Sequence, residues 1–117
     1  MKATFVRFGE IELDGKRYEK DVVVDRGQVT KRRKGPSRPY RDRYGHTPLT
    51  AEEAIPWDCR VLIVGTGADG QLPIADDVLD QARRRGVELV ALPTDEACRL
   101  LSRSDPDETA AILHVTC

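Results

Sequence analysis

The sequence pattern with the clearest chemical meaning is the glycine-rich string Gly65-Thr66-Gly67-Ala68-Asp69-Gly70, which fits G-x-G-x-x-G. It follows an apolar run, Arg60 to Val64, that has the length of a strand buried on both faces. After such a strand, glycines allow a phosphate to approach backbone N–H groups. A turn that serves only the fold is the favoured interpretation. The alternative is an anionic-ligand site formed by Gly65, Thr66, Gly67, Asp69, Gly70, Thr94 and His46.

Binding of a full dinucleotide is disfavoured by three features of the same region. Gln71-Leu72-Pro73 delays the helix that should open within the motif. Glu88 lies at the start of the next predicted strand, whereas a ribose-binding acid belongs at its end. A chain of 117 residues is also too short for two mononucleotide-binding halves and a further β region. We therefore expect no cofactor.

A second candidate site is the basic stretch from Arg26 to Gly45, where eight Lys and Arg residues stand against one acid, Asp42. The net charge of the whole chain is −1, so the remainder is acidic. This charge separation favours a surface that binds an acidic protein partner or a second copy of the chain. Nucleic acid is a weaker alternative because the pI is near 6.1, and nucleic-acid-binding domains often exceed ~9. The expected contact residues are Arg32, Arg33, Arg38, Tyr40, Arg41 and Tyr44.

The evidence for catalysis or metal binding is weaker. Asp69 or Asp95 could act as a general base at the ends of parallel strands, although turn and capping roles also explain them. Cys98 and His114 could meet, but a cysteine about one turn into a helix is typical of a buried apolar residue. His46 and His114 are expected to be structural. No spacing of His, Cys, Asp or Glu is typical of a metal site, so we expect no metal.

Length and composition are those of one globular domain, with 39% hydrophobic and 33% charged residues. The longest apolar run, Val61 to Val64, is far shorter than the ~20 residues that span a bilayer. The N-terminal residues lack the apolar core of a signal peptide. Three widely spaced cysteines without a Cys-x-x-Cys pair suit a reducing compartment. These features predict a cytoplasmic protein with no membrane segment.

The chain divides into a β-meander (residues 1–32), a basic Pro/Gly loop without helix or strand (33–49) and an α/β region (50–117). In the meander, Asp14-Gly15 predicts a tight hairpin turn. The expected strands are Glu10–Leu13, Lys16–Tyr18, Asp21–Val24 and Gln28–Arg32.

In the α/β region, Thr50 and Glu53 match a capping box that opens a helix of about one turn. A second helix, Ala75–Arg85, has an apolar stripe and is followed by Gly86, which is a suitable C-terminal cap. The flanking strands predict a parallel β-α-β unit. The remaining elements are strands Arg60–Val64, Val87–Leu92 and Ala111–Val115, and a helix from about Thr94 to Ser102 that is capped by Thr94.

An ordered set of short motifs along nearly the whole chain resembles the family called domain of unknown function 498. The motifs are Phe8-Gly9-Glu10-Ile11, Asp14-Gly15-Lys16-Arg17-Tyr18, Asp21-Val22-Val23-Val24, Tyr44-Gly45-His46, Leu62-Ile63-Val64-Gly65-Thr66-Gly67, Pro93-Thr94-Asp95-Glu96-Ala97 and Leu113-His114-Val115-Thr116-Cys117. That family includes the adipogenesis-associated domain protein and a mitochondrial complex I assembly factor, and the chain is most similar to a prokaryotic branch.

The resemblance implies an α/β (α+β) fold with three layers, β+α/β/α, in which an N-terminal β-meander joins a mixed sheet and two main helices. It implies no catalytic residues. Together with the basic stretch, it favours a non-enzymatic accessory or assembly-type protein that binds a partner protein. The alternatives are a small anionic-ligand-binding protein that uses Gly65–Gly70, and weak nucleic-acid binding through the basic loop.

Overall fold

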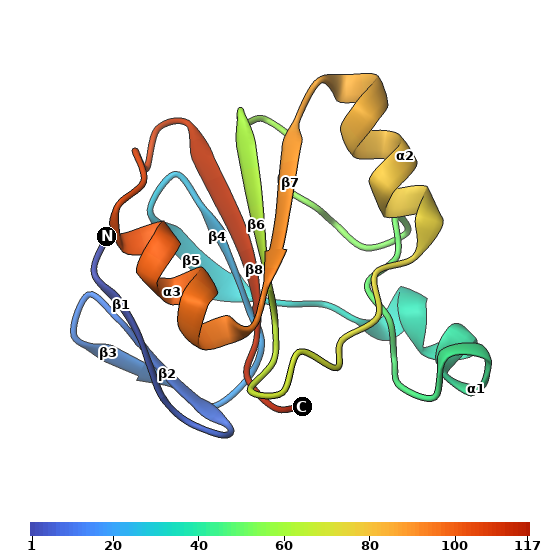
Figure 1. Ribbon diagram of the computed structural model, residues 1–117, viewed down its shortest axis with the longest axis horizontal. Coiled ribbons are helices and arrows are strands. Elements are labelled where there is room, and N and C mark those ends of the chain that lie inside the picture. The colour runs from blue at the N-terminus through green and yellow to red at the C-terminus, as the bar shows by residue number, and fades with distance from the viewer.

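A five-stranded mixed sheet forms the middle of the molecule in the computed structural model, which describes all 117 residues (Figure 1). Its strand order is β5-β4-β8-β6-β7. β6 runs parallel to β7 and β8, as the predicted β-α-β unit requires, and β4 runs antiparallel to β8 and β5. The strands are β4 (Val22–Asp25), β5 (Gln28–Lys31), β6 (Val61–Thr66), β7 (Glu88–Leu92) and β8 (Thr109–His114).

A separate three-stranded antiparallel sheet lies at the N-terminus, with β1 (Ala3–Arg7), β2 (Glu10–Leu13) and β3 (Lys16–Tyr18) in sequential order. Its turn at Asp14-Gly15 has positive φ at both residues, as the sequence predicts. The meander expected over residues 1–32 is therefore divided between two sheets. β4 lies between β5 and β8 in the main sheet, and its valines contact the apolar cores on both faces of that sheet.

Two helices cover opposite faces of the main sheet, α2 (Asp76–Arg85) and α3 (Thr94–Ser102) (Figure 1). α2 has acids in its first turn and arginines in its last, and it ends at Gly86 with φ +67°. α3 shares its face of the sheet with the small N-terminal sheet. The observed layers are thus β+α/β/α, which confirms the predicted fold class.

The central strand β8 separates two apolar cores. Ala111 and Leu113 face the core beneath α3 and the small sheet, whereas Ala110 and Ile112 face the core beneath α2. This alternation follows from the two-residue period of a strand. All four side chains are at most 1% exposed, so the end of β8 is held rigidly from both sides.

Cys98 lies inside the first core and is completely buried, as the sequence predicts. Burial raises the pKa of its thiol to about 12, with a smaller contribution from Asp95. We expect iodoacetamide at neutral pH to alkylate Cys98 at least about 100-fold more slowly than the half-buried Cys117, since the thiolate is the reactive form. Peptide mapping of the native protein against reaction time tests this, with a urea-unfolded sample as control. Equal rates for the two cysteines in native buffer would contradict it.

The basic loop predicted for residues 33–49 contains two short helices. A 3₁₀ helix, η1 (Gly35–Tyr40), is followed by α1 (Arg41–Tyr44). Pro36 stands in the first turn of η1, where proline is tolerated because the missing N–H has no helical partner. The expectation of a segment without helix is therefore wrong.

Two predicted helix caps are also wrong. At Thr50–Glu53 the chain makes only a turn, in which the Glu53 N–H donates to the Thr50 carbonyl at 3.2 Å, and no helix follows. The Glu53 side chain points inward to Arg32. Thr94 is the first residue of α3 and makes no cap, because its hydroxyl donates to the His114 carbonyl.

No helix has both the length and the apolar character needed to cross a lipid bilayer.

Candidate functional site

Strand pairing brings Asp21, Arg32 and His114 together from distant parts of the sequence. Asp21 immediately precedes β4, whose first residue Val22 pairs with Lys31 on one side and Leu113 on the other. Asp21 is the residue before Val22, Arg32 is the residue after Lys31, and His114 is the residue after Leu113. Antiparallel pairing therefore places Asp21 between Arg32 and His114. The Arg32 N–H donates to the Asp21 carbonyl at 3.0 Å, which extends the β4–β5 pairing by one step.

The Asp21 carboxylate is fully engaged. Its Oδ2 accepts from Arg32 Nη1 at 2.9 Å and lies 2.8 Å from His114 Nδ1, and its Oδ1 accepts from the Val115 N–H at 3.0 Å. Burial alone would raise the pKa of Asp21. The hydrogen bond and charge of His114, the Val115 N–H and the Arg32 charge together lower it below its usual value. Asp21 is thus a fixed negative charge at neutral pH.

Arg32 is also held from its other side, by Glu53. Arg32 Nε and Nη2 each donate to one oxygen of the Glu53 carboxylate at 2.8 Å, which is a bidentate ion pair. The Ser37 hydroxyl donates to the same carboxylate at 2.5 Å and contacts the Thr50 hydroxyl at 2.8 Å. We call the set Asp21, Arg32, Glu53 and His114 the buried ion network.

The buried ion network corrects the expectation that Arg32 belongs to an exposed contact surface. Arg32 is only 3% exposed, and its guanidinium faces two carboxylates and the Pro48 carbonyl. Burial lowers the pKa of Arg32, but Glu53 and Asp21 raise it further, so the guanidinium stays charged. Its role is to fix the start of the basic segment against the sheet.

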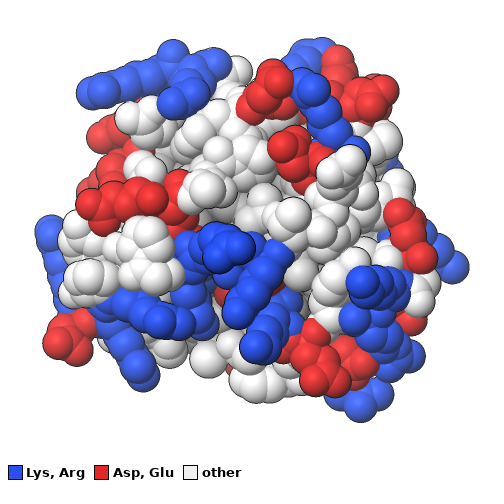
Figure 2. Space-filling view, turned by 180° about the vertical axis from the view of Figure 1, so that it is seen from behind, with Lys and Arg blue, Asp and Glu red and all other residues white.

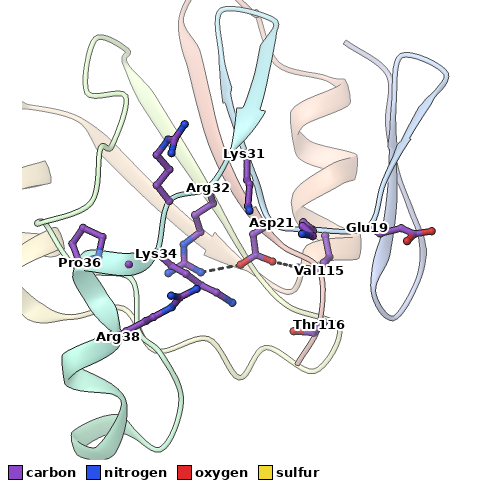
Figure 3. Close-up of a pocket in the computed structure, with 12 residues that line it drawn as sticks. Glu19, Asp21, Lys31, Arg32, Lys34, Pro36, Arg38, Val115 and Thr116 are labelled. Atoms are coloured by element: carbon purple, nitrogen blue, oxygen red, sulfur yellow. Dashed lines mark hydrogen bonds and ion pairs between the residues drawn. The ribbon is translucent and has the colours of Figure 1, made fainter.

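A cavity of about 530 Å³ lies over Asp21 and Arg32 of this network, between the basic stretch and residues 115–116 (Figure 3). We call it the basic cleft. Figure 3 draws the ion pair of Arg32 with Asp21 and the bond from Val115 to Asp21 within it. Val115 is the one hydrophobic residue in the lining. The cations that line the cleft besides Arg32 are Lys20, Lys31, Arg33, Lys34 and Arg38, and the acid besides Asp21 is Glu19.

The charges in the cleft belong to a wider basic surface. Figure 2 shows Lys and Arg side chains gathered over the left and centre of the lower half of the face opposite that of Figure 1, and a further group at the lower right beyond a patch of acids. Arg33, Arg38, Lys20 and Lys31 are exposed, and Lys34 is half-buried. None of the five forms a salt bridge within 4.0 Å, so their charges are available to a ligand.

A smaller cavity of about 240 Å³ adjoins the basic cleft and shares Arg32, Lys34 and Thr116 with it. We call it the histidine pocket, because both histidines of the chain line it. His46 is exposed, and the His114 side chain is 14% exposed. The remaining lining residues are Arg41, Thr47, Gln71, Leu72 and Cys117.

The glycine-rich loop lines neither of these cavities, because its N–H groups bind the chain itself. Ala68 N–H donates to the Thr116 carbonyl at 2.6 Å, and Gln71 N–H donates to the Cys117 carbonyl at 2.8 Å. The Gly67 N–H donates to the Thr94 hydroxyl at 2.8 Å.

The glycine at position 67 serves packing. A Cβ built there would lie 2.1 Å from the Cys117 carbonyl carbon, and φ is +106°. Gly65 and Thr66 are buried, and Thr94 is 0% exposed and ties the loop to β8. The Gly67 N–H is used by the Thr94 hydroxyl and the Gly70 N–H by the Gly67 carbonyl, which favours a turn that serves the fold. The anion site at Gly65, Thr66, Gly67, Asp69, Gly70 and Thr94 stays a prediction. Of that set only His46 lines one of the two cavities.

The other expected contact residues fall into different places. Arg33 and Arg38 line the basic cleft, and Arg41 lines the histidine pocket. Tyr40 and Tyr44 instead line a third cavity of about 230 Å³ near the start of α2. The basic segment is thus not one continuous surface.

The carboxylates considered as general bases are not in the site. Asp69 is exposed on the glycine-rich turn, and Asp95 is exposed and paired with Arg99 at 3.0 Å. Neither lines the basic cleft or the histidine pocket. Cys98 does not meet His114, whose imidazole binds Asp21. The structure contains no group of three or more His, Cys, Asp or Glu side chains placed to hold a metal ion.

Sequence reasoning missed Asp21, Glu53 and Lys20 as parts of this site. The sequence gives one indication for Asp21, because it is an acid directly before a run of valines that predicts a buried strand. Glu53 was assigned to a capping box, and Lys20 lies outside the basic stretch.

Solved structures support the same fold. The chain is 31% identical to the conserved hypothetical protein PH1505 from Pyrococcus horikoshii OT3, with 100% of each chain covered and a TM-score of 0.81. It is 30% identical to a protein called MT938, with 98% of this chain and 99% of that chain covered and a TM-score of 0.70. XCC1710 from Xanthomonas campestris, at 15% identity and a TM-score of 0.62, shares the fold, with 98% and 86% of the two chains covered.

No curated protein matches the chain. The model of one family does match, over residues 4–113, and its description is protein of unknown function (DUF498/DUF598). The match covers nearly all of the small sheet and the strands of the main sheet up to Leu113. It includes Asp21, Arg32 and Glu53 of the buried ion network, and His114 lies one residue beyond it. The resemblance found in the sequence is confirmed, and the chain belongs to the DUF498 family.

Proposed function

We propose that this protein is an accessory protein that binds an acidic segment of a partner protein in the basic cleft. The observation that carries the proposal is the set of five cations, Lys20, Lys31, Arg33, Lys34 and Arg38, around one concave surface with a single apolar residue. Like charges held this close repel one another, so a ligand of opposite charge relieves an unfavourable interaction. Complementary charge of this kind speeds association and selects acidic partners.

The buried ion network supports the proposal because it holds the cleft in shape before a partner arrives. Arg32 ties the start of the basic segment to Asp21 and Glu53, and Ser37 in η1 donates to the same Glu53. A cleft that is already ordered loses less conformational entropy on binding.

Phe8 supports a protein as the partner. It is 58% exposed and is the one exposed large hydrophobic side chain of the molecule. It stands near the cleft, since the next residue, Gly9, donates its N–H to the carbonyl of the cleft residue Val115 at 2.7 Å. Exposed aromatic side chains are frequent anchors in protein interfaces. The expected partner segment therefore carries an apolar side chain beside its acids.

A small anionic molecule is the second candidate ligand. The cleft volume of about 530 Å³ lies within the range of small-molecule pockets, roughly 300–1,000 Å³, although those are mostly apolar. In this alternative, the anionic ligand that the sequence places at the glycine-rich loop binds in the basic cleft instead. A cytoplasmic location is part of the proposal, and the free state of all three cysteines supports it.

Charge reversal in the cleft tests the proposal. In the variant Arg33→Glu/Arg38→Glu, we expect a polypeptide that co-purifies with the wild-type protein from its own host at low salt to be lost by at least about 10-fold. Native mass spectrometry of the purified protein measures the bound species. A small bound mass in place of a polypeptide would favour the second candidate.

The matched control is Arg84→Glu/Arg103→Glu, which makes the same change in net charge at two exposed arginines with no salt bridge and outside the cleft. It should retain the polypeptide, and both variants should keep the wild-type melting temperature within about 3 °C, because exposed substitutions change stability little. Retention of the polypeptide by the cleft variant would overturn the proposal.

A further inference from the structure

We propose that Thr116 and His114, with Asp21 as a positioning residue, form a site for hydrolysis of small esters that carry an anionic group. The Thr116 hydroxyl is the nucleophile and the His114 imidazole is the general base. This inference goes beyond partner binding and does not depend on it. It rests on contacts at the floor of the histidine pocket, which the proposed binding function does not use.

The hydrogen bonds fix which ring nitrogen of His114 is basic. Nδ1 lies 2.8 Å from Asp21 Oδ2, and an ionised carboxylate can only accept, so Nδ1 carries the proton. In the neutral ring Nε2 is then an acceptor. Nε2 lies 3.2 Å from Thr116 Oγ1, a distance at which the hydroxyl can donate to the neutral ring. The order hydroxyl, imidazole, carboxylate is that of an activated nucleophile.

Each member of the triad is held by a contact that does not belong to the triad. Asp21 Oδ1 accepts from the Val115 N–H at 3.0 Å. The His114 carbonyl accepts from the Thr94 hydroxyl at 2.5 Å, and the Thr116 carbonyl accepts from the Ala68 N–H at 2.6 Å. These bonds fix the backbone on both sides of Val115, which is what a reacting geometry requires.

The triad is accessible to a ligand and lies in a positive environment. His114 and Thr116 both line the histidine pocket, and Thr116 also lines the basic cleft. Lys34 and Arg41 line the same pocket, where a cation stabilises the negative oxygen that develops on an attacked carbonyl. The pocket of about 240 Å³ suits a small acyl group, and the neighbouring cations favour one that carries a carboxylate or phosphate.

The reaction needs only the ester and water. The Thr116 oxygen forms a bond to the acyl carbon while its proton passes to His114 Nε2. The bond from that carbon to the alcohol oxygen then breaks, and His114 gives the proton to the departing alcohol. Water attacks the acyl-threonine and loses its proton to His114 in the same way, and the returned proton restores the Thr116 hydroxyl as the carboxylic acid leaves.

The test uses the full chain and the mono-para-nitrophenyl ester of terephthalic acid as probe, whose carboxylate cannot reach its own ester group. We expect release of nitrophenolate and a carboxybenzoyl adduct on the peptide that contains Thr116, detected by mass spectrometry after acid quenching. Thr116→Val keeps the shape of the side chain without the hydroxyl and should lower the rate at least about 100-fold. Thr116→Ser restores the hydroxyl and should restore both the adduct and turnover.

Two further variants test the general base and its positioning. His114→Gln should also lower the rate at least about 100-fold while circular dichroism shows a folded protein. Asp21→Asn should lower kcat with little change in KM, because Lys34 and Arg41, the pocket cations that do not bind Asp21, stay in place. Circular dichroism should show that this variant is folded as well. The inference is overturned if wild-type turnover equals that of Thr116→Val, or if the carboxybenzoyl group is found on lysines and not on Thr116.

Discussion

Replacing Arg32 by leucine is expected to lower the free energy of unfolding by about 3 to 5 kcal/mol, because it leaves two buried carboxylates without their shared cation. The side chains of Asp21 and Glu53 are 10% and 3% exposed, and both accept hydrogen bonds from Arg32. For a domain of this size the loss corresponds to a fall of about 10 to 20 °C in melting temperature. Urea titration followed by circular dichroism measures the free energy directly.

Two neighbouring substitutions separate the loss of the ion pairs from the loss of a charge. Arg33→Leu removes the same charge at an exposed position and should change the free energy of unfolding by less than about 1 kcal/mol. Arg32→Lys keeps the charge but cannot make the bidentate pair with Glu53, so it should fall between wild type and Arg32→Leu. If Arg32→Leu is as stable as Arg33→Leu, Arg32 does not hold the basic segment in place.

The second large effect is expected from Gly67→Ala, which should destabilise the protein by more than about 3 kcal/mol. The added Cβ would lie 2.1 Å from the Cys117 carbonyl carbon, so residues 116–117 must move. That movement breaks the bonds from Ala68 N–H and Gln71 N–H to the Thr116 and Cys117 carbonyls. Thermal unfolding measures the change.

Gly27→Ala is the matched control for Gly67→Ala. Gly27 also has a positive φ, +78°, but nothing lies within 4 Å of its added Cβ. It therefore reports the backbone strain alone, which costs about 1 kcal/mol for alanine. Equal effects at the two positions would contradict the close approach of the chain to Gly67. A ligand site at this glycine would instead predict lost binding with unchanged stability.

The helices, turns and strands that the sequence predicted correctly are determined by residues within them or directly next to them. Helix α2 was expected at Ala75–Arg85 and spans Asp76–Arg85, because the apolar stripe, the charges at its two ends and Gly86 all agree. The hairpin turn at Asp14-Gly15 has the positive φ values that its residue types permit. The parallel pairing of β6 and β7 follows from the short helix between them.

What could not be predicted depends on pairing between distant segments. Nothing within residues 22–25 distinguishes a strand of the small sheet from one that pairs with β8. The burial of Arg32 depends on carboxylates that lie 11 and 21 positions away, so its sequence neighbours give it the pattern of a surface residue. The glycine-rich loop has the composition of a phosphate-binding loop, and only the approach of residues 116–117 decides where its N–H groups point.

The sequence therefore predicted the positive charge of the candidate site but not its position in the fold. The basic stretch does supply Arg33 and Arg38 to the cleft. Asp21 lines the cleft and His114 lines the adjoining histidine pocket, and the two side chains meet only because β4 pairs with β8. A sequence shows the number of cations in a segment, whereas their gathering around a cavity is a property of the tertiary structure.

The most direct test of the account is a nuclear magnetic resonance titration of the ¹⁵N-labelled protein with a short glutamate-rich peptide that contains one leucine. We predict shifts in the amide signals of the cleft residues and of Phe8, with an affinity that falls as salt rises because these charges are exposed. The same titration of Arg33→Glu/Arg38→Glu should show no shifts there. Shifts confined to α2 or the third cavity, or unchanged binding in the variant, would contradict the account.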